Sequence, residues 1–148
     1  MQIWVDADAC PGEIKQLLYR VSERLKIKLT LVANQSMRVP PSELIETVLV
    51  PDGANVADRR IVELASPGDL VVTADIPLAA DVVAKGAEAI DPRGRLYSDA
   101  NIGELLARRN MLDQLRGSGH VSGGPSNFGP KDRQAFANQL DRWLAKNK

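Results

Sequence analysis

A chain of 148 residues with 44% hydrophobic and 26% charged side chains has the composition of a globular protein, and we expect one domain over residues 1–148. Its 19 basic and 19 acidic residues balance, which excludes a strongly basic field over the whole protein. The single cysteine excludes an internal disulfide framework, and we find neither a signal-peptide pattern nor an apolar run long enough to cross a bilayer, so we expect a cytoplasmic protein with no membrane partner.

The first third of the chain predicts three strands and one helix. An apolar run predicts a strand over residues 2–6. Apolar residues spaced by three and four then predict a helix over residues 12–25, and the preceding proline suits its first turn. A second strand is predicted over residues 28–33, and the proline-containing loop 36–44 leads into a short third strand over residues 47–50.

The middle of the chain continues the same alternation. A helix is predicted over residues 56–65, and a Pro-Gly turn separates it from a strand over residues 70–73. That strand is a continuous apolar run, which is typical of strands buried on both faces. A helix over residues 76–85 and a short strand over residues 88–90 follow.

The last third predicts two helices joined by a glycine-rich loop. The helices cover residues 101–115 and 130–146, and the loop covers residues 117–129. Glycines let backbone N–H groups approach phosphates, so the loop could fold over a substrate, although a simple connector has the same composition. His120 lies in this loop and is expected to be a surface residue.

Alternating strands and helices predict an α/β fold, a three-layer α/β/α sandwich around a mostly parallel sheet. In such sheets ligands bind beyond the carboxyl ends of the strands, at the point where the strand order reverses. The residues that directly follow each predicted strand are therefore the first candidates for a functional site.

Two carboxylates, Asp6 and Asp8, stand at the end of the first predicted strand. Carboxylates this close repel each other unless a cation or a shared proton relieves the repulsion, and Mg²⁺ and Mn²⁺ prefer oxygen ligands. We therefore interpret the pair as an acidic functional site, although Asp8 alone could be the cap of the helix that follows.

Three further polar residues extend this candidate site. Thr73 ends the strand over residues 70–73, the expected neighbour of the first strand, and Asp75 follows it, so both should reach the same edge of the sheet. Asp75 also precedes a helix, so it could instead be a helix cap. Asp58 lies near the start of the helix over residues 56–65, where the helix dipole explains an acid equally well.

Side chains near the same edge are suited to hold a phosphate-containing substrate. Asn34 and Arg38 follow the second strand, Arg93 follows the fifth, and Lys131 lies at the start of the C-terminal helix. Arginine and lysine bind phosphate groups, so these residues are predicted substrate contacts, although each alone is also typical of a solvated surface. Further candidates of the same kind are Arg108, Arg109 and Arg133.

Taken together, several segments resemble the YaiI/YqxD family of bacterial proteins, and the resemblance covers nearly the whole chain. The segments are WVDADACP at 4–11, LVAN at 31–34, VAD at 56–58, GDLVVTADIPLA at 68–79, PRG at 92–94 and GGP at 123–125. The fold of that family is regarded as similar to that of PIN domains, which are Mg²⁺-dependent nucleases. The resemblance therefore implies a PIN-like fold and, by analogy, a nuclease reaction.

The same resemblance implies roles for individual residues. The implied metal ligands are Asp6, Asp8, Asp58 and Asp75, with Thr73 beside the metal in a Thr-x-Asp arrangement that PIN-like enzymes often carry. The expected cofactor is Mg²⁺ or Mn²⁺, and the expected partner is nucleic acid, with RNA favoured over DNA. An Asp commonly precedes the Val-Ala-Asp element of the family, and Asn55 stands at that place here, which would weaken the metal site.

The predicted reaction is phosphodiester hydrolysis, with Asp6, Asp8, Thr73 and Asp75 as the catalytic residues. Two cations about 4 Å apart, held by three or four carboxylates, can activate a water and stabilise the leaving oxygen. Two other functions fit the same residues. One is a phosphatase of the haloacid-dehalogenase type, in which Asp6 would be the nucleophile; the other is a PIN-like module that binds nucleic acid without cleaving it.

Overall fold

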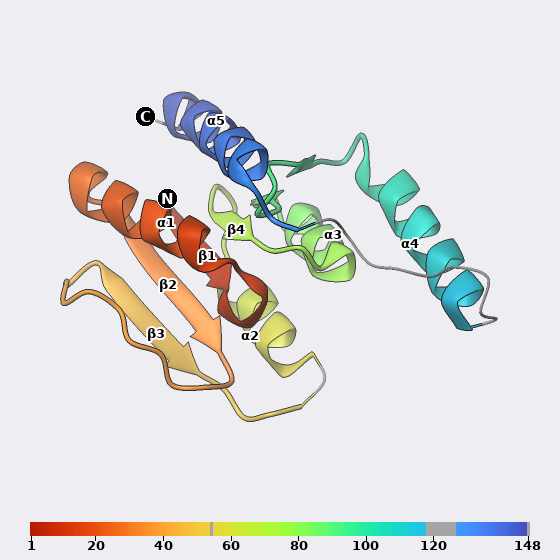
Figure 1. Cartoon of the computed structure of the whole chain (residues 1–148), viewed down its shortest axis with the longest axis horizontal. Coiled ribbons are helices and arrows are strands. Elements are labelled where there is room, and N and C mark those ends of the chain that lie inside the picture. The colour runs from red at the N-terminus through yellow and green to blue at the C-terminus, as the bar shows by residue number, and fades with distance from the viewer. Residues whose placement is uncertain (54, 118–126, 148) are drawn as a thin grey trace.

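This computed structural model describes residues 1–53, 55–117 and 127–147. The protein is built around a six-stranded sheet (Figure 1). In spatial order the strands are β3 (Ile45–Leu49), β2 (Lys28–Ala33), β1 (Gln2–Asp6), β4 (Leu70–Val72), β5 (Glu88–Ile90) and β6 (Leu96–Tyr97). All neighbouring strands pair in parallel except β5 and β6, which are antiparallel. The sheet is therefore mostly parallel, as predicted.

The strand order reverses at β1. The chain steps outward from β1 to β2 and β3, then returns to place β4 on the other side of β1. Within β1, Ile3 pairs with Leu29 on one side and with Leu70 on the other. The carboxyl ends of β1 and β4 therefore flank the position at which open α/β sheets bind ligands.

Helices cover both faces of the sheet. One face carries α1 (Gly12–Leu25) and α5 (Pro130–Lys146), and the other carries α2 (Val56–Leu64), α3 (Ile76–Ala84) and α4 (Ile102–Gly117) (Figure 1). This arrangement confirms the three-layer α/β/α sandwich. None of the helices in the described residues is both long and apolar enough to cross a membrane.

The alternating side chains of β1 fill the cores on both faces. Ile3 and Val5 belong to the core under α1 and α5, whereas Trp4 belongs to the core on the opposite face. Successive strand side chains point to opposite faces, so one buried strand supplies both layers. The indole N–H of Trp4 donates to Oδ2 of Asp69 at 3.0 Å, so this buried acid has a structural partner before the start of β4, away from the carboxyl ends.

Sequence periodicity predicted most of the element boundaries. The predicted elements over residues 2–6, 12–25, 28–33 and 88–90 coincide with β1, α1, β2 and β5. The third strand begins at Ile45, two residues before its predicted start, and ends at Leu49. Glu46 and Thr47 are exposed on this edge strand, so the apolar pattern that marks a strand is interrupted there.

Two short elements were not predicted. A 3-10 turn, η1 (Ala7–Ala9), follows β1, and β6 returns antiparallel to β5 through a tight turn in which the Gly94 N–H donates to the Asp91 carbonyl at 2.9 Å. Helix α4 extends to Gly117, so the predicted loop 117–129 begins one residue too early. Residues 118–126, with His120 and most of that predicted loop, lie outside the described residues.

Candidate functional site

The carboxyl ends of three neighbouring strands carry the predicted site residues. β1 ends in Asp6 and leads through η1 to Asp8, β2 leads to Asn34, and β4 leads to Thr73 and Asp75. Because the three strands are adjacent and parallel, all five residues lie at the same edge of the sheet. This edge is also where the strand order reverses.

The Thr73 hydroxyl links the ends of β1 and β4. It donates to Oδ2 of Asp6 at 3.1 Å and accepts a hydrogen bond from the backbone N–H of Asp75 at 3.0 Å. Asp6 is only 8% exposed and Thr73 only 1%. Since the two residues are 67 positions apart, this buried hydrogen bond also holds the two strand ends together.

Asp8 connects the ends of β1 and β2. Its Oδ2 atom accepts a hydrogen bond from the backbone N–H of Asn34 at 2.9 Å, and the residue is otherwise exposed. The N-cap residue of α1 is Pro11, and no side chain caps that helix. The simpler interpretation of Asp8 as a helix cap is therefore wrong.

Asp75 and Asp58 form a pair of acids on the helices of the other face. Asp75 is the N-cap of α3, where its Oδ1 atom accepts a hydrogen bond from the Leu78 N–H at 2.9 Å. Asp58 lies in the first turn of α2, close enough to Asp75 for the two carboxyl groups to interact. Burial, followed by the charges of Asp75 and Asp6, raises the pKa of Asp58 to about 6.

The four acids leave an excess of negative charge at this edge. Burial raises the pKa of Asp6, the hydrogen bond from Thr73 lowers it, and the charges of Asp75 and Asp8 raise it again. Within the described parts of the chain, no lysine or arginine forms an ion pair with any of the four acids. Among the same residues, no three His, Cys, Asp or Glu side chains are already arranged to hold a metal ion.

A groove beside α2 and α3 exposes part of this acidic cluster. It has a volume of about 680 Å³, and both Asp58 and Asp75 line it together with Arg59 and Arg109. An anionic ligand bound through the arginines would therefore lie close to the acids. The sequence analysis missed Arg59, although its position directly after Asp58 at the start of a predicted helix was an available signal.

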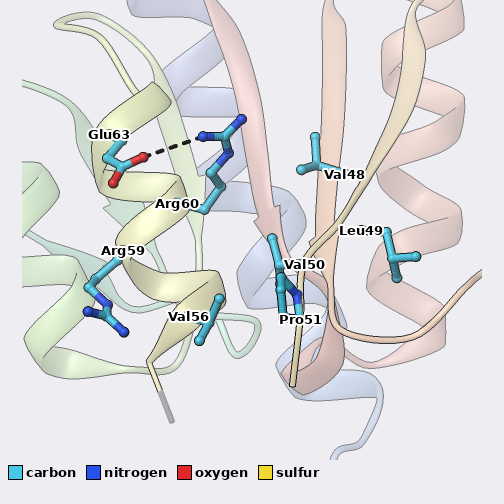
Figure 2. A pocket seen from close by; sticks show the side chains of 8 residues that line it. All are labelled: Val48, Leu49, Val50, Pro51, Val56, Arg59, Arg60 and Glu63. Carbon is cyan, nitrogen blue, oxygen red and sulfur yellow. Dashed lines mark hydrogen bonds and ion pairs between the residues drawn. The ribbon is translucent and has the colours of Figure 1, made fainter. Parts of the chain in front are cut away.

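A second hollow lies between the end of β3 and α2 (Figure 2), and it shares Arg59 and Glu63 with the first groove. Its volume is about 400 Å³. Leu49, Val50 and Val56 contribute apolar walls, and Glu63 in its lining is paired with Arg60 at 3.5 Å. Because this hollow contains none of the four acids, we do not include it in the candidate site.

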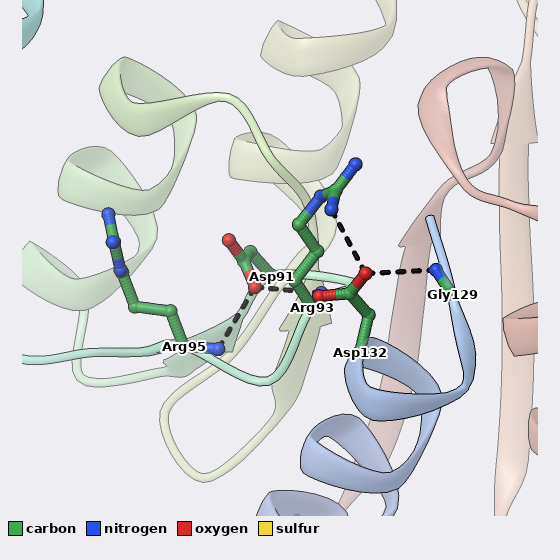
Figure 3. A network of polar contacts seen from close by, with 5 residues as sticks. All are labelled: Asp91, Arg93, Arg95, Gly129 and Asp132. Carbon is green, nitrogen blue, oxygen red and sulfur yellow. Dashed lines mark hydrogen bonds and ion pairs between the residues drawn. The ribbon is translucent and has the colours of Figure 1, made fainter. Parts of the chain in front are cut away.

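Arg93 contacts α5 in the structure. Its Nη1 atom donates to Oδ2 of Asp132 at 3.0 Å, and the same oxygen accepts a hydrogen bond from the Gly129 N–H at 2.9 Å (Figure 3). Its guanidinium also lies 5.8 Å from the centre of the Phe128 ring. Arg93 therefore joins the turn after β5 to the start of α5. A substrate that contacts Arg93 would have to bind a guanidinium group that is already paired with Asp132.

The other predicted substrate contacts differ in how they are placed. Asn34 is half-buried, and its backbone N–H is the group that contacts an acid, Asp8. Arg38 and Lys131 are exposed, in the segment after β2 and in the first turn of α5. Their substrate contacts remain predictions.

We expect Asp58→Asn to stabilise the protein at pH 7.5 and not at pH 4. The unfolded pKa of Asp is about 4 and the folded pKa of Asp58 is about 6, so this residue contributes stability below pH 4 that is lost as the pH rises through 6. Asp58 is partly exposed and water screens the repulsion, so we expect a gain of about 1 kcal/mol, or roughly 3 °C, in thermal melts at pH 7.5.

Asp99→Asn, which changes an exposed acid outside the cluster, is the matched control for this measurement. We expect its melting temperature to follow that of the unmodified chain at both pH values. An Asp58→Asn gain that is as large at pH 4 as at pH 7.5 would contradict the assignment of the effect to charge repulsion.

Comparison with known proteins gives matches over almost the whole chain. A family model described as "Uncharacterized BCR, YaiI/YqxD family" matches residues 4–146. The chain is 58% identical over 146 residues to a "UPF0178 protein" of Dechloromonas aromatica (strain RCB), which covers 99% of this chain and 97% of the relative. It is 54% identical over 147 residues to a "UPF0178 protein" of Maridesulfovibrio salexigens, with the same coverage of 99% and 97%. No solved structure gives a significant match. The extent of these matches establishes that the protein belongs to the YaiI/YqxD family.

Proposed function

We propose that the protein hydrolyses phosphodiester bonds in single-stranded nucleic acid, RNA in preference to DNA, with the help of Mg²⁺ or Mn²⁺. The observation that carries the proposal is the meeting of four acids, with no basic ion-pair partner among the described residues, where the strand order reverses. Crowded carboxylates need a cation or a proton to balance their charge.

The chemistry of the donor set suits a hard divalent cation. The candidate ligands are the carboxylate oxygens of Asp6, Asp8, Asp58 and Asp75, and Mg²⁺ and Mn²⁺ favour oxygen ligands. Burial and the charges of Asp75 and Asp6 raise the pKa of Asp58 to about 6, and a ligand must be deprotonated, so we expect binding of a cation to release a proton below about pH 6. A bound cation would supply an activated water and stabilise the leaving oxygen.

The residues around the acids orient three of them through hydrogen bonds. Asp6 accepts from Thr73, Asp8 from the backbone of Asn34, and Asp75 from the backbone of Leu78. Without a cation, Asp58 has a pKa of about 6, so it is the proton-binding acid of the cluster whose charge a cation would replace near neutral pH. A water that attacks phosphorus in line with the 3′-oxygen would expel that oxygen, so the products should carry 5′-phosphates.

The alternative functions have less support. A phosphatase that uses Asp6 as its nucleophile needs this carboxylate to reach phosphorus, but Asp6 is 8% exposed and one of its oxygens is bonded to Thr73. A cysteine nucleophile is also disfavoured, since burial raises the pKa of Cys10 to about 12. A binding module without catalysis would differ in the result of a cleavage assay and, if it binds no cation, in the effect of Mn²⁺ on the melting temperature.

The test is to incubate the purified protein with fluorescein-labelled single-stranded RNA and DNA, in Mn²⁺, in Mg²⁺ and in a chelator. We expect slow, cation-dependent cleavage that leaves 5′-phosphate ends. Asp8→Asn should lower the rate at least about 100-fold, because it removes a ligand charge while keeping an oxygen that can accept from Asn34. Asp99→Asn should cleave at the original rate.

Melting temperature provides a second measurement of cation binding on the same samples. Millimolar Mn²⁺ should raise the melting temperature of the unmodified chain by mass action and raise that of Asp8→Asn less. No cleavage of any substrate, together with no change in melting temperature, would refute the nuclease proposal and favour the binding module. Phosphate trapped covalently on Asp6 would favour the phosphatase.

A further inference from the structure

Helices α1 and α5 lie side by side on the face of the sheet opposite α2 and α3 (Figure 1). A groove runs between these two helices. It consists of two hollows of about 730 and 300 Å³. Both hollows share Leu17 and Arg20 of α1 and Arg133 and Ala137 of α5, so they join along the length of the two helices.

The middle of this groove is positively charged. Arg20 and Arg24 lie one turn apart on α1, and Arg133 lies opposite them on α5. All three are exposed, and within the described residues none of them forms an ion pair or hydrogen bond with another side chain. The acids of the groove, Glu13 and Asp141, belong one to each hollow and lie toward opposite ends of the helices.

This charge pattern is unfavourable for the protein alone. Like charges at i and i+4 on a helix, as in Arg20 and Arg24, repel each other and destabilise the helix. By contrast, Arg60, Arg108 and Arg109 on α2 and α4 each have a carboxylate partner within one turn. The three groove arginines thus present guanidinium groups that are available to an anionic ligand.

We propose that the groove between α1 and α5 binds the sugar-phosphate backbone of a single-stranded nucleic acid. The inference rests on the proposed function and locates a surface that holds its substrate. Guanidinium groups match phosphate oxygens in geometry and charge. From Glu13 to Arg24 the groove is about 16 Å long at 1.5 Å per residue, so its three arginines can contact successive phosphates of a strand that lies along it.

One end of the groove lies at the edge of the sheet that carries the acids. Glu13 is in the first turn of α1, which follows η1 and Asp8, and Gly129 directly precedes α5. A strand held along the helices would therefore extend toward the acidic cluster. Because α1 and α5 pack against each other, the groove is a surface channel with hollows of about 730 and 300 Å³, which suits a flexible single strand better than a rigid duplex.

Binding can be measured separately from cleavage, in a chelator, by fluorescence anisotropy of a fluorescein-labelled single-stranded RNA. We expect the double variant Arg20→Gln/Arg24→Gln to bind at least about tenfold more weakly than the unmodified chain at low salt. Three phosphate contacts on a single strand predict a slope of about −2 for log affinity against log salt, which is a loss of about 20-fold between 50 and 200 mM KCl. The double variant should lose only about threefold over the same range.

The matched control is Arg60→Gln/Arg142→Gln, which removes the same charge from exposed arginines outside the groove. It should keep nearly the original affinity and salt slope, and Arg133→Gln alone should reproduce part of the loss. Melting temperatures should show that all the variants are folded. Equal affinity of the groove and control variants would overturn the proposal, and so would the absence of RNA binding by the unmodified chain or equal binding of a duplex.

The binding and cleavage results separate the two proposals. Groove-dependent binding without cleavage on any substrate would support the groove and refute the nuclease. Cleavage of RNA, together with an RNA affinity that does not change when Arg20, Arg24 or Arg133 is substituted, would support the nuclease proposal and refute the groove proposal. Asp99→Asn should bind RNA in the chelator as tightly as the unmodified chain, because Asp99 is exposed and lies outside both the acidic cluster and the groove lining.

Discussion

Asp75→Asn should reduce cleavage of single-stranded RNA at least about 100-fold while leaving the fold intact. Asp75 has two roles that a single substitution can separate: it is an N-cap whose Oδ1 atom accepts the Leu78 N–H, and it is one of the four clustered acids. Asn caps a helix about as well as Asp, so the start of α3 should survive. The charge is lost, so cation binding and cleavage should fail.

Asp75→Ala provides the comparison that isolates the cap. It removes both the charge and the accepting oxygen, so its melting temperature should be lower than that of Asp75→Asn by the equivalent of about 1 kcal/mol, or roughly 3 °C. Both variants should be equally inactive in the cleavage assay with Mn²⁺. If Asp75→Asn cleaves within about threefold of the unmodified rate, Asp75 is only a helix cap.

The position of the acids at one edge of the sheet was predictable because it depends on two regular features. Strands alternate with helices along the chain, so their carboxyl ends share one edge, and the strand order reverses beside the first strand. Asp6 ends β1, Thr73 and Asp75 come just after β4, and their hydrogen bonds through Thr73 follow from that placement. Local sequence was therefore sufficient for this part of the site.

Contacts that depend on how helices and loops pack were not predictable in the same way. Asp58 reaches Asp75 only because α2 lies against α3, and no local pattern specifies that pairing. The ion pair of Arg93 with Asp132 joins residues 39 positions apart on an irregular turn and a helix. The antiparallel strand β6 has only two residues, which is too short for a periodic pattern to be recognised.

Gly94→Ala should have the largest effect on stability of the substitutions considered, about 3 kcal/mol or roughly 10 °C in melting temperature. Gly94 has φ of +94°, and a Cβ atom there would lie 2.5 Å from the backbone carbon of Ala135 and 2.7 Å from its oxygen. The backbone of α5 cannot move away cheaply, because Phe136, the next residue, is completely buried in the core.

Two other glycines separate the causes of that loss. Gly68 has nearly the same φ, +89°, but no atom lies within 4 Å of its Cβ position, so Gly68→Ala should show the backbone strain alone, about 1 kcal/mol. Gly103 is helical with open space around it, so Gly103→Ala should be neutral or stabilise α4 by up to about 1 kcal/mol. Denaturant titration of the three variants measures each change in the free energy of unfolding.

A Gly94→Ala loss no larger than that of Gly68→Ala would mean that the turn after β5 does not hold α5 in place. If the larger loss is found, the close contact between Gly94 and Ala135, beside the Arg93–Asp132 ion pair, positions α5 and with it one wall of the groove that carries Arg133.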